Sequence, residues 1–470
     1  MSARRGALPG WAGGAARHLA PAVAIGAGAG GIAVIDGPMT MLVVGTALTL
    51  ALFVVVGLRP LSVAAWGAAA FTAPLSGIRV SALALSDVAL IIAVGLTVAS
   101  LVARRRPDAA AIPAGPLAGL GAVALGGVVA TIHASDPSTG LAGVTTFVVG
   151  SAGPVVAMAL WSPTRAQLRW FTSLWLAGAV TSALWAILVG PAVFGRRAGL
   201  TTHPNHLGIV CVLATGLALG MLVTRARQAR APALVALPPL LAALVLSGSR
   251  AAVVGVVAVV VAMAWLCRRF RLALRALAVV VAFGVIVLGG LVEVPEQSGL
   301  GRLAGGRSSS ESDTARAENL ARSLERLERH PFTGEGFEFA EEAHNIYLQV
   351  AVAAGPLGVI GLVLVAGGVL RAIRLGAWSL RRPVRGDRAL LAGLGAGYTG
   401  YLVAGTFQNL LRDRYLWLYV AAALSLSSRL VDDARREPAA LADRGHVDGP
   451  DLPGASTPTP RHSSGIRPAR

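Results

Sequence analysis

Residues 316–358 read RAENLARSLERLERHPFTGEGFEFAEEAHNIYLQVAVAAGPLG and join the two kinds of segment from which this chain is built. The first part is polar and charged, whereas an apolar run begins near His344 and reaches about residue 370. A run of this length crosses the hydrocarbon core of a bilayer, which is about 30 Å thick. The stretch therefore predicts a polar segment outside the membrane that re-enters it at His344 and Asn345.

The composition extends this interpretation to the whole chain. Its 470 residues are 55% hydrophobic and 14% charged, whereas soluble domains carry roughly 25% charged residues. Apolar runs of about 18 residues or more recur along most of its length. We expect an all-α fold, a polytopic helical membrane protein with about 12–14 transmembrane helices and one long extracytoplasmic loop containing short helices.

The net charge of +18 is spread in a way that argues against nucleic acid as a partner. The sequence contains no lysine, and arginines gather in short clusters between apolar runs, at 104–106, 225–230, 268–275 and 371–388. Cytoplasmic loops of membrane proteins carry such clusters. A nucleic-acid-binding protein gathers its charge on one folded face, so we expect membrane lipid and no nucleic acid.

Hydropathy and charge divide the chain into four parts. We expect N-terminal transmembrane helices over 1–292, an extracytoplasmic loop over 293–344, and C-terminal transmembrane helices over 345–430. Residues 431–470 are rich in Pro, Ser, Arg and Asp, and are predicted to form a disordered cytoplasmic tail. The alternation of spans places Arg196, Arg197 and Arg250 on the same extracytoplasmic side as the loop.

The loop itself carries a helical pattern from about 313 to 328, with apolar residues at Ala317, Leu320, Leu324 and Leu327. Such a stripe suits a helix that lies on the membrane surface or over a cavity, although a plain surface helix and linker is the simpler explanation. The helix should end before Pro331, because the residue before a proline avoids the helical conformation.

His344 is a candidate general base, since an imidazole titrates near neutral pH. Glu342 is a nearby carboxylate that can orient the imidazole, and Asn345 follows it directly. The alternative is a histidine that merely begins a helix at the membrane interface.

Arg250 lies in LSGSRAA, residues 246–252, between two closely joined apolar runs. Ser247, Gly248 and Ser249 are expected to break the helix there. A charge at membrane depth usually faces the protein interior or a water-filled site, and the arginine fork fits two phosphate oxygens. The alternative is an arginine that extends toward lipid headgroups.

Arg196 and Arg197 precede HPNHLG at 203–208. Binding of anionic lipid by interfacial arginines is the simple explanation. His203 and His206 have the spacing of a metal-binding pair, but no set of carboxylates or cysteines accompanies them, so no metal is expected. Pro204 and Asn205 more simply shape the start of a span.

Five segments in this order resemble the O-antigen ligase and polymerase family of membrane glycosyltransferases. They are RAGLTTHPNHLG (197–208), LSGSRAA (246–252), RHPFTGEGF (329–337), AHNIYLQ (343–349) and GPLG (355–358). The similarity covers roughly residues 195–375. Each segment alone is weakly specific, whereas the ordered set on one side of the membrane is more specific.

The resemblance implies a function. Members of this family move a saccharide from an undecaprenyl-diphosphate carrier to an acceptor hydroxyl at the extracytoplasmic face of the cytoplasmic (inner) membrane. The acceptor is a glycan, a lipid or a protein. The family includes ligases, polymerases and protein O-glycosyltransferases, which its shared motifs do not separate. A single displacement that inverts the anomeric centre is expected, without cofactor or metal.

The resemblance also implies roles for residues. His344 matches the family's essential histidine and would deprotonate or hold the acceptor hydroxyl. Arg250 and Arg197 would bind the diphosphate, with Arg196 as an alternative to its neighbour. Supporting roles fall to Asn345, Glu342 and Asn205, and further arginines of the loop that can meet the donor are Arg302, Arg307, Arg316 and Arg322.

Two other classes of function stay open. A transporter or flippase for lipid-linked saccharides or polar solutes has a similar number of spans, although transporters often show internal repeats and ionisable groups near the midplane. A non-catalytic scaffold is the third class. Here the polar residues concentrate on one side and no repeat is visible, which favours the glycosyltransferase.

Overall fold

The computed structural model describes residues 58–80, 83–104, 112–134, 136–190, 192–193, 195–224, 227–268, 301–302, 310–337, 343–378, 385–408, 411 and 413–445. Several predicted features lie outside these ranges. They are the spans expected before residue 58 and at about 276–292, the loop residues 303–309, Glu342, and the tail beyond residue 445.

The described chain is all-α, apart from two short hairpins. Its helices are α3 (Leu58–Thr72), α4 (Leu85–Arg104), α5 (Ala114–Ala130), α6 (Pro137–Trp161), α7 (Arg165–Leu188), α8 (Pro204–Val223), α9 (Arg227–Leu246), α10 (Arg250–Leu266), α13 (Ser310–Arg329), α14 (Ile346–Trp378), α15 (Arg385–Ala404) and α16 (Arg414–Gly445). Short 3-10 turns are η1 (Ala73–Leu75), η2 (Thr131–His133) and η5 (Gly405–Phe407). Strands β1 (Arg79–Val80) and β2 (Leu83–Ala84) pair antiparallel, as do β3 (Ala192–Val193) and β4 (Arg196–Arg197).

These helices confirm a polytopic helical membrane protein. Six helices among the described residues are long and apolar enough to cross a bilayer, namely α4, α6, α7, α8, α14 and α15 with its η5 extension. The shorter apolar helices are α3 with η1, α5, α9 and α10. The predicted total of about 12–14 includes spans outside the described ranges and stays a prediction.

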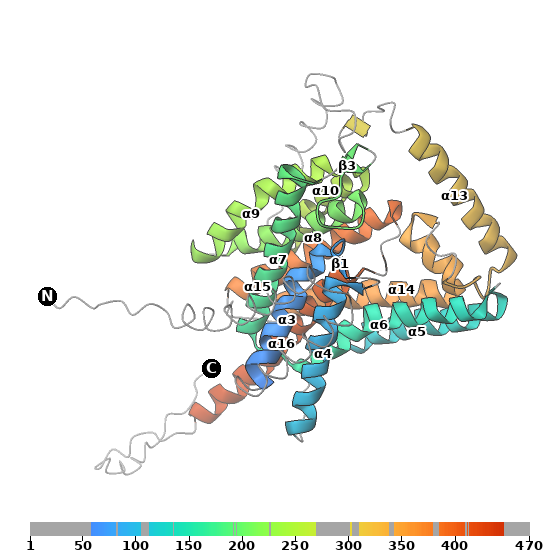
Figure 1. Ribbon diagram of the computed structural model, residues 1–470. Coiled ribbons are helices and arrows are strands. Elements are labelled where there is room, and N and C mark those ends of the chain that lie inside the picture. Colours follow the sequence, from blue (N-terminus) through green and yellow to red (C-terminus); the bar gives the residue numbers. More distant parts are fainter. Residues whose placement is uncertain are drawn as a thin grey trace, which may run out of the picture.

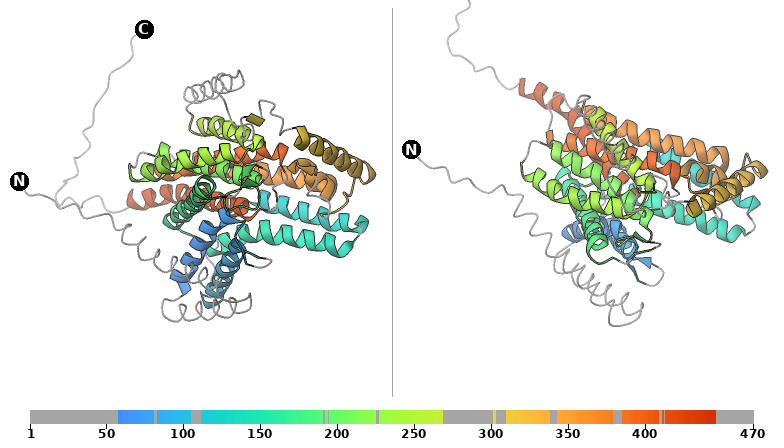
Figure 2. Two further views of the ribbon diagram at one scale, coloured as in Figure 1. Left: turned by 45° about the horizontal axis from the view of Figure 1, so that its top comes forward. Right: turned by 90° about the horizontal axis from the view of Figure 1, so that it is seen from above.

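The helices form a bundle in which α5, α6 and α14 run side by side (Figure 1). Figure 2 shows the same grouping in two further views, with α13 at the end of the group, outside the bundle. The most enclosed of the candidate spans is α8, which packs against α7, α9, α10 and α15. The first turn of α8 therefore has a fixed place relative to the first turn of α10.

Glycines allow α8 and α15 to approach closely. A Cβ atom on Gly216 would lie 2.5 Å from the backbone nitrogen of Gly397, and one on Gly220 would lie 2.9 Å from the Cα of Gly393. Helices inside membranes associate through such small residues, because close backbone contact replaces the hydrophobic driving force. On the other side of α15, a Cβ on Gly400 would lie 2.7 Å from the carbonyl oxygen of Gly255 in α10.

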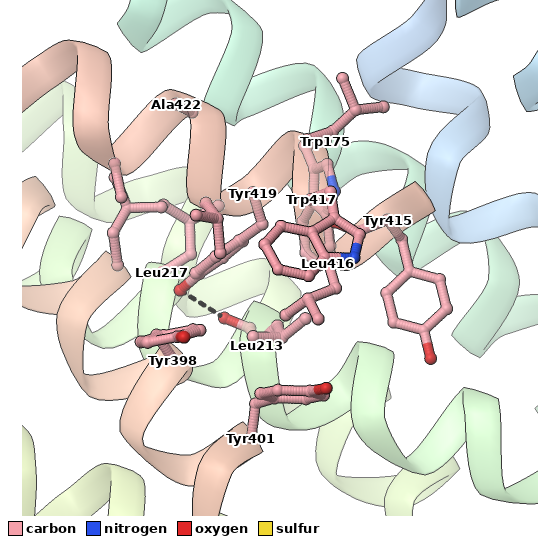
Figure 3. Packing of buried hydrophobic residues seen from close by; sticks show 14 of the residues in the cluster. Trp175, Leu213, Leu217, Tyr398, Tyr401, Tyr415, Leu416, Trp417, Tyr419 and Ala422 are labelled. Carbon is pink, nitrogen blue, oxygen red and sulfur yellow. Dashed lines mark hydrogen bonds between the residues drawn. The ribbon is translucent and has the colours of Figure 1, made fainter. Parts of the chain in front are cut away.

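Aromatic side chains fill the core between α7, α8, α15 and α16 (Figure 3). The rings of Trp175 and Tyr419 meet edge to face, with centroids 5.2 Å apart. The Tyr419 hydroxyl donates to the carbonyl oxygen of Leu213 at 3.2 Å, so its buried polar atom is satisfied. This core holds the last helix, α16, against α7 and α8. Helix α7 ends, and helix α8 begins, near the polar residues of the candidate site.

Helix α14 is broken at Gly355, whose φ of 59° and ψ of −158° are not helical. The turn over residues 332–336 packs into this break, and the Glu335 N–H donates to the carbonyl oxygen of Val352 at 2.7 Å. Phe337 then inserts between α5 and α6, and its ring stacks on that of Phe147 with centroids 5.3 Å apart. The segment after α13 is thus fixed to three helices before the chain reaches His344.

Segments that the sequence predicts on the same side of the membrane meet at the same end of the bundle. At one end, Arg169 of α7 binds Asp387 of α15, with Nε and Oδ1 2.6 Å apart, and Arg429 of α16 donates to the carbonyl oxygen of Ser162. At the other end meet the segments around Arg196, Arg250, Asp313 and Phe337. The naming of this second end as extracytoplasmic still rests on the arginine distribution.

One predicted boundary is corrected. The helix α16 continues to Gly445, so residues 431–445 are helical where the sequence predicted a disordered tail. Ala and Arg, which recur in this segment, are good helix formers and extend a helix that the core already holds, which outweighs the unfavourable Pro438. The predicted boundary at 292/293 lies outside the described residues, and the remaining division of the chain stays a prediction.

Candidate active site

The site begins at the break between α9 and α10, where the sequence predicted one. Gly248 has a φ of 61°, and the Ser249 side chain accepts from the N–H of Ala252 at 3.3 Å to start α10. Two arginines bind the buried carbonyl oxygens that directly follow α9: Arg196 Nε donates to Ser247 O at 2.8 Å, and Arg302 donates to Gly248 O at 3.1 Å. Cations are favoured at a helix C-terminus.

Arg196 is the member of the arginine pair that belongs to this site. It is only 9% exposed, and its Nη2 donates to Asn205 Oδ1 at 2.5 Å. Burial, together with Arg302, Arg316 and Arg250, lowers the pKa of Arg196 to about 10, so it stays charged at neutral pH. Successive residues of a strand point to opposite faces, so Arg197 on the same strand β4 faces away from Arg196.

Arg250 begins α10 and binds a carboxylate of the loop helix. Its Nη1 donates to Asp313 Oδ2 at 3.0 Å, and its Nη2 donates to Asp313 Oδ1. This hydrogen bonding lowers the pKa of the Asp313 carboxyl below its usual value. Arg316, one turn further along α13, lies 3.8 Å from Asp313 Oδ1. The ion pair between Arg250 and Asp313 therefore ties α13 to the membrane part of the chain.

His344 lies half-buried just before α14. Its φ of 47° falls in the left-handed region, which costs a non-glycine residue of the order of 1 kcal/mol and is often found at functional sites. Burial, and after it the charge of Arg316, lowers the pKa of His344. The imidazole is thus neutral at neutral pH and can accept a proton.

The predicted supporting residues have different positions. Asn205 accepts from Arg196, as described above. The Asn345 side chain accepts from the N–H groups of Tyr347 and Leu348, at 2.9 and 3.2 Å, and so caps the start of α14. Its hydrogen bonds serve the helix start rather than His344. Glu342 lies outside the described residues, so its predicted role stays a prediction.

The first turn of α8 adds two histidines to this end of the bundle. His203 Nδ1 accepts from the N–H of Asn205 at 3.1 Å. Burial is the main cause that lowers the pKa of His203 to about 4, with further contributions from His206, Arg196, His344 and Arg316. His206 Nδ1 lies 3.6 Å from Asp413 Oδ1, and the Tyr415 hydroxyl donates to the other oxygen of Asp413 at 2.8 Å.

Several residues of this site are not apparent from the sequence. Asp313 and Asp413 are not among the predicted site residues, because no local pattern indicates the partner of either carboxylate. Arg302 and Arg316 were named among the loop arginines, and the structure now places both beside Arg250. Within the described ranges, no three His, Cys, Asp or Glu side chains are grouped as metal ligands.

The chemistry available here is that of a cationic site with one neutral base, His344. Arg196, Arg250, Arg302 and Arg316 lie close enough to perturb one another electrostatically. Clustered guanidinium groups bind groups with several anionic oxygens, such as a diphosphate. A neutral His344 beside them can take a proton from a hydroxyl.

Comparison with known protein families finds a match over part of the chain. Residues 233–363 match the family model described as O-antigen ligase. This part of the chain is similar to the O-antigen ligase family. The matched region contains Arg250, Asp313 and His344, whereas Arg196 and His203 precede it. No curated protein matches the chain.

The match confirms the resemblance seen in the sequence, over a shorter range than the one expected there. It supports a membrane glycosyltransferase-like role in surface polysaccharide assembly, with a lipid-linked saccharide and a glycan acceptor as substrates.

Proposed function

We propose that this protein transfers a saccharide from an undecaprenyl-diphosphate carrier to an acceptor hydroxyl at the extracytoplasmic face of the cytoplasmic membrane. The observation that carries the proposal is the convergence of Arg196, Arg250 and His344 at one end of the bundle, from three segments far apart in the sequence. Such a site combines an anion-binding surface with a neutral base.

The arginines bind the diphosphate of the donor. Arg196 uses Nε and Nη2 for protein contacts, and among the described residues its Nη1 has no hydrogen-bond partner. Arg250 offers its fork once Asp313 leaves it. Fixed cations aimed at developing charge stabilise a leaving diphosphate without reorganisation. Because guanidinium groups supply this charge, we expect transfer in the presence of a metal chelator to equal transfer without it.

His344 acts on the acceptor. Its neutral imidazole takes the proton from the acceptor hydroxyl as the oxygen attacks the anomeric carbon of the donor sugar. The new bond joins that oxygen to the anomeric carbon, and the bond from the same carbon to the phosphate oxygen breaks. The electron pair leaves with the undecaprenyl diphosphate, and the proton stays on His344. One displacement of this kind inverts the anomeric configuration.

The proposal is tested in cells that carry the wild-type chain, His344→Ala, or no copy of the gene. Envelope glycans and carrier-linked saccharides are measured at equal membrane levels of the two proteins. We expect His344→Ala to match the strain without a copy, with saccharides accumulating on the carrier. Long accumulated chains indicate a ligase, and single repeat units indicate a polymerase.

A wild-type glycan pattern in the His344→Ala strain would show that His344 is not the general base. A second control separates catalysis from transport. Accumulated carrier-linked saccharide on the extracytoplasmic side, detected by labelling of intact cells, supports a block in transfer. Accumulation on the cytoplasmic side alone would instead favour the flippase.

A further inference from the structure

His203 is held in a single tautomer. It precedes α8, and its Nδ1 accepts the backbone N–H of Asn205 at 3.1 Å. A nitrogen that accepts a hydrogen bond carries no proton, so a neutral imidazole in this position has its hydrogen on Nε2. The two ring nitrogens point in nearly opposite directions. Nε2–H therefore points away from the backbone of α8.

The surroundings of this N–H are cationic. Charged or titratable groups that act on His203 come from four elements: Arg196 on β4, His206 on α8 itself, Arg316 on α13, and His344 before α14. The ring is half-buried, and among the described residues its Nε2 has no hydrogen-bond partner. A half-buried donor without a partner, beside an anion-binding group of arginines, suits an oxygen of a bound anion.

His203 differs from His344 in what it can do. Its Nδ1 is occupied by a backbone donor, and Nε2 already carries a hydrogen, so the ring cannot serve as a base. Burial and the neighbouring cations lower its pKa to about 4, so it does not become a cation between about pH 5 and pH 8. What remains is a neutral hydrogen-bond donor.

We propose that His203 donates its Nε2–H to a phosphate oxygen of the sugar diphosphate bound at Arg196 and Arg250. The inference rests on the proposed function and adds a binding residue that precedes the matched region. A neutral donor stabilises the oxygen on which charge develops, without adding another charge to a site that already holds four arginines.

The variant His203→Asn separates this role from the capping role. Asparagine retains a side-chain oxygen that caps the helix but has no donor at the position of Nε2. We expect kcat/KM for the lipid-linked donor to fall about 10- to 100-fold, because one donor to a developing anion is removed. The KM for the acceptor and the melting temperature in detergent should equal those of wild type. His203→Ala loses both roles and should also melt earlier.

The outcomes decide the inference in either direction. Wild-type kcat/KM in His203→Asn would overturn it, as would a rise in acceptor KM equal to the loss for the donor. Measurements at about pH 5.5 and about pH 7.5 add a check on charge. The ratio of wild-type to variant kcat/KM should be the same at both. A ratio that grows toward acid pH would show a charged His203 and contradict the neutral donor.

A binding measurement distinguishes failure of this inference from failure of the proposed function. Inorganic pyrophosphate is titrated into the purified full chain by calorimetry, which needs no turnover. Binding that is about tenfold weaker in His203→Asn supports the donor even if no transfer is found. Equal binding by the two proteins overturns it, even where the wild type is an active transferase.

Discussion

The guanidinium of Arg250 and the carboxylate of Asp313 form a bidentate ion pair that joins α10 to the loop helix α13. A carboxylate in this fork occupies the positions that two oxygens of a phosphate would take. If Arg250 binds the donor diphosphate, Asp313 has to leave first. Donor binding and the position of α13 are therefore coupled in this account.

The first prediction concerns this competition. Asp313→Asn removes the charge that competes for Arg250, so the KM for the lipid-linked donor should fall by a few-fold. The pair is partly exposed, and such pairs contribute about 0–1 kcal/mol. Donor KM is measured with the purified enzyme. Glu318→Gln, an exposed carboxylate on the same helix, is the matched control and should leave KM unchanged. A raised KM in Asp313→Asn would contradict the displacement.

The second prediction decides between the two adjacent arginines. Arg196→Gln should reduce transfer about a hundredfold, because a buried cation beside Arg250 is lost. Arg197→Gln, on the opposite face of β4, should remain within about twofold of wild type, as expected of a surface substitution. Initial rates at equal protein levels are compared. Loss of transfer in Arg197→Gln alone would show that Arg197, and not Arg196, binds the diphosphate, as the family resemblance implies.

The third prediction concerns pH. His344 acts as a base only when neutral, and its pKa lies below the ordinary 6.5. The acid limb of kcat/KM should therefore lie below pH 6.5. Arg316→Gln removes a positive charge near the imidazole, so protonation becomes easier and the limb should move to higher pH. Arg322→Gln, an exposed arginine on α13, should not move it. An unchanged limb in Arg316→Gln would contradict the proximity of the two groups.

The fourth prediction concerns the break in α14. A Cβ on Gly355 would lie 2.8 Å from Phe332 O, in a backbone conformation that is nearly restricted to glycine. Gly355→Ala should reduce the free energy of unfolding by about 1–3 kcal/mol and loosen the turn over 332–336 that precedes His344. Thermal melting and transfer are both measured. On the same helix, a Cβ on Gly367 meets nothing within 4 Å, so Gly367→Ala should be tolerated. Equal melting of both variants would contradict this packing.

The sequence predicts the helices well, because apolar runs and arginine clusters are local signals. It places the start of α8, the break before Arg250 and the end of α13 within a few residues of their positions. These features depend on proline, glycine and capping residues that act within one turn. The fold class therefore follows from the chain without tertiary information.

The contacts of the site do not follow in the same way. Two adjacent arginines look alike in the sequence, and only the pairing of β3 with β4 turns Arg196 inward. The pairing of Arg250 with Asp313 joins residues 63 positions apart, which no local pattern encodes. The sequence therefore predicts which residue types gather on one side, but not which of them meet.

The helix α13 shows the same limit. Its apolar stripe was predicted correctly, yet Leu320 and Leu324 are 45% and 44% exposed. The Ser323 residue is only 2% exposed, and Arg316 lies on the same polar face, toward the site. A periodic stripe fixes the faces of a helix but not which face meets the protein.

The most direct test of the central claim is a transfer assay with purified wild type, His344→Gln and Arg250→Gln. Each protein is given the same undecaprenyl-diphosphate saccharide and acceptor, and glycosylated acceptor and free undecaprenyl diphosphate are both quantified. We predict that wild type forms the two products in equal amounts, and that each variant loses both by about a hundredfold or more. Full transfer by either variant, or no glycosidic bond formed by a folded wild type, would contradict the account.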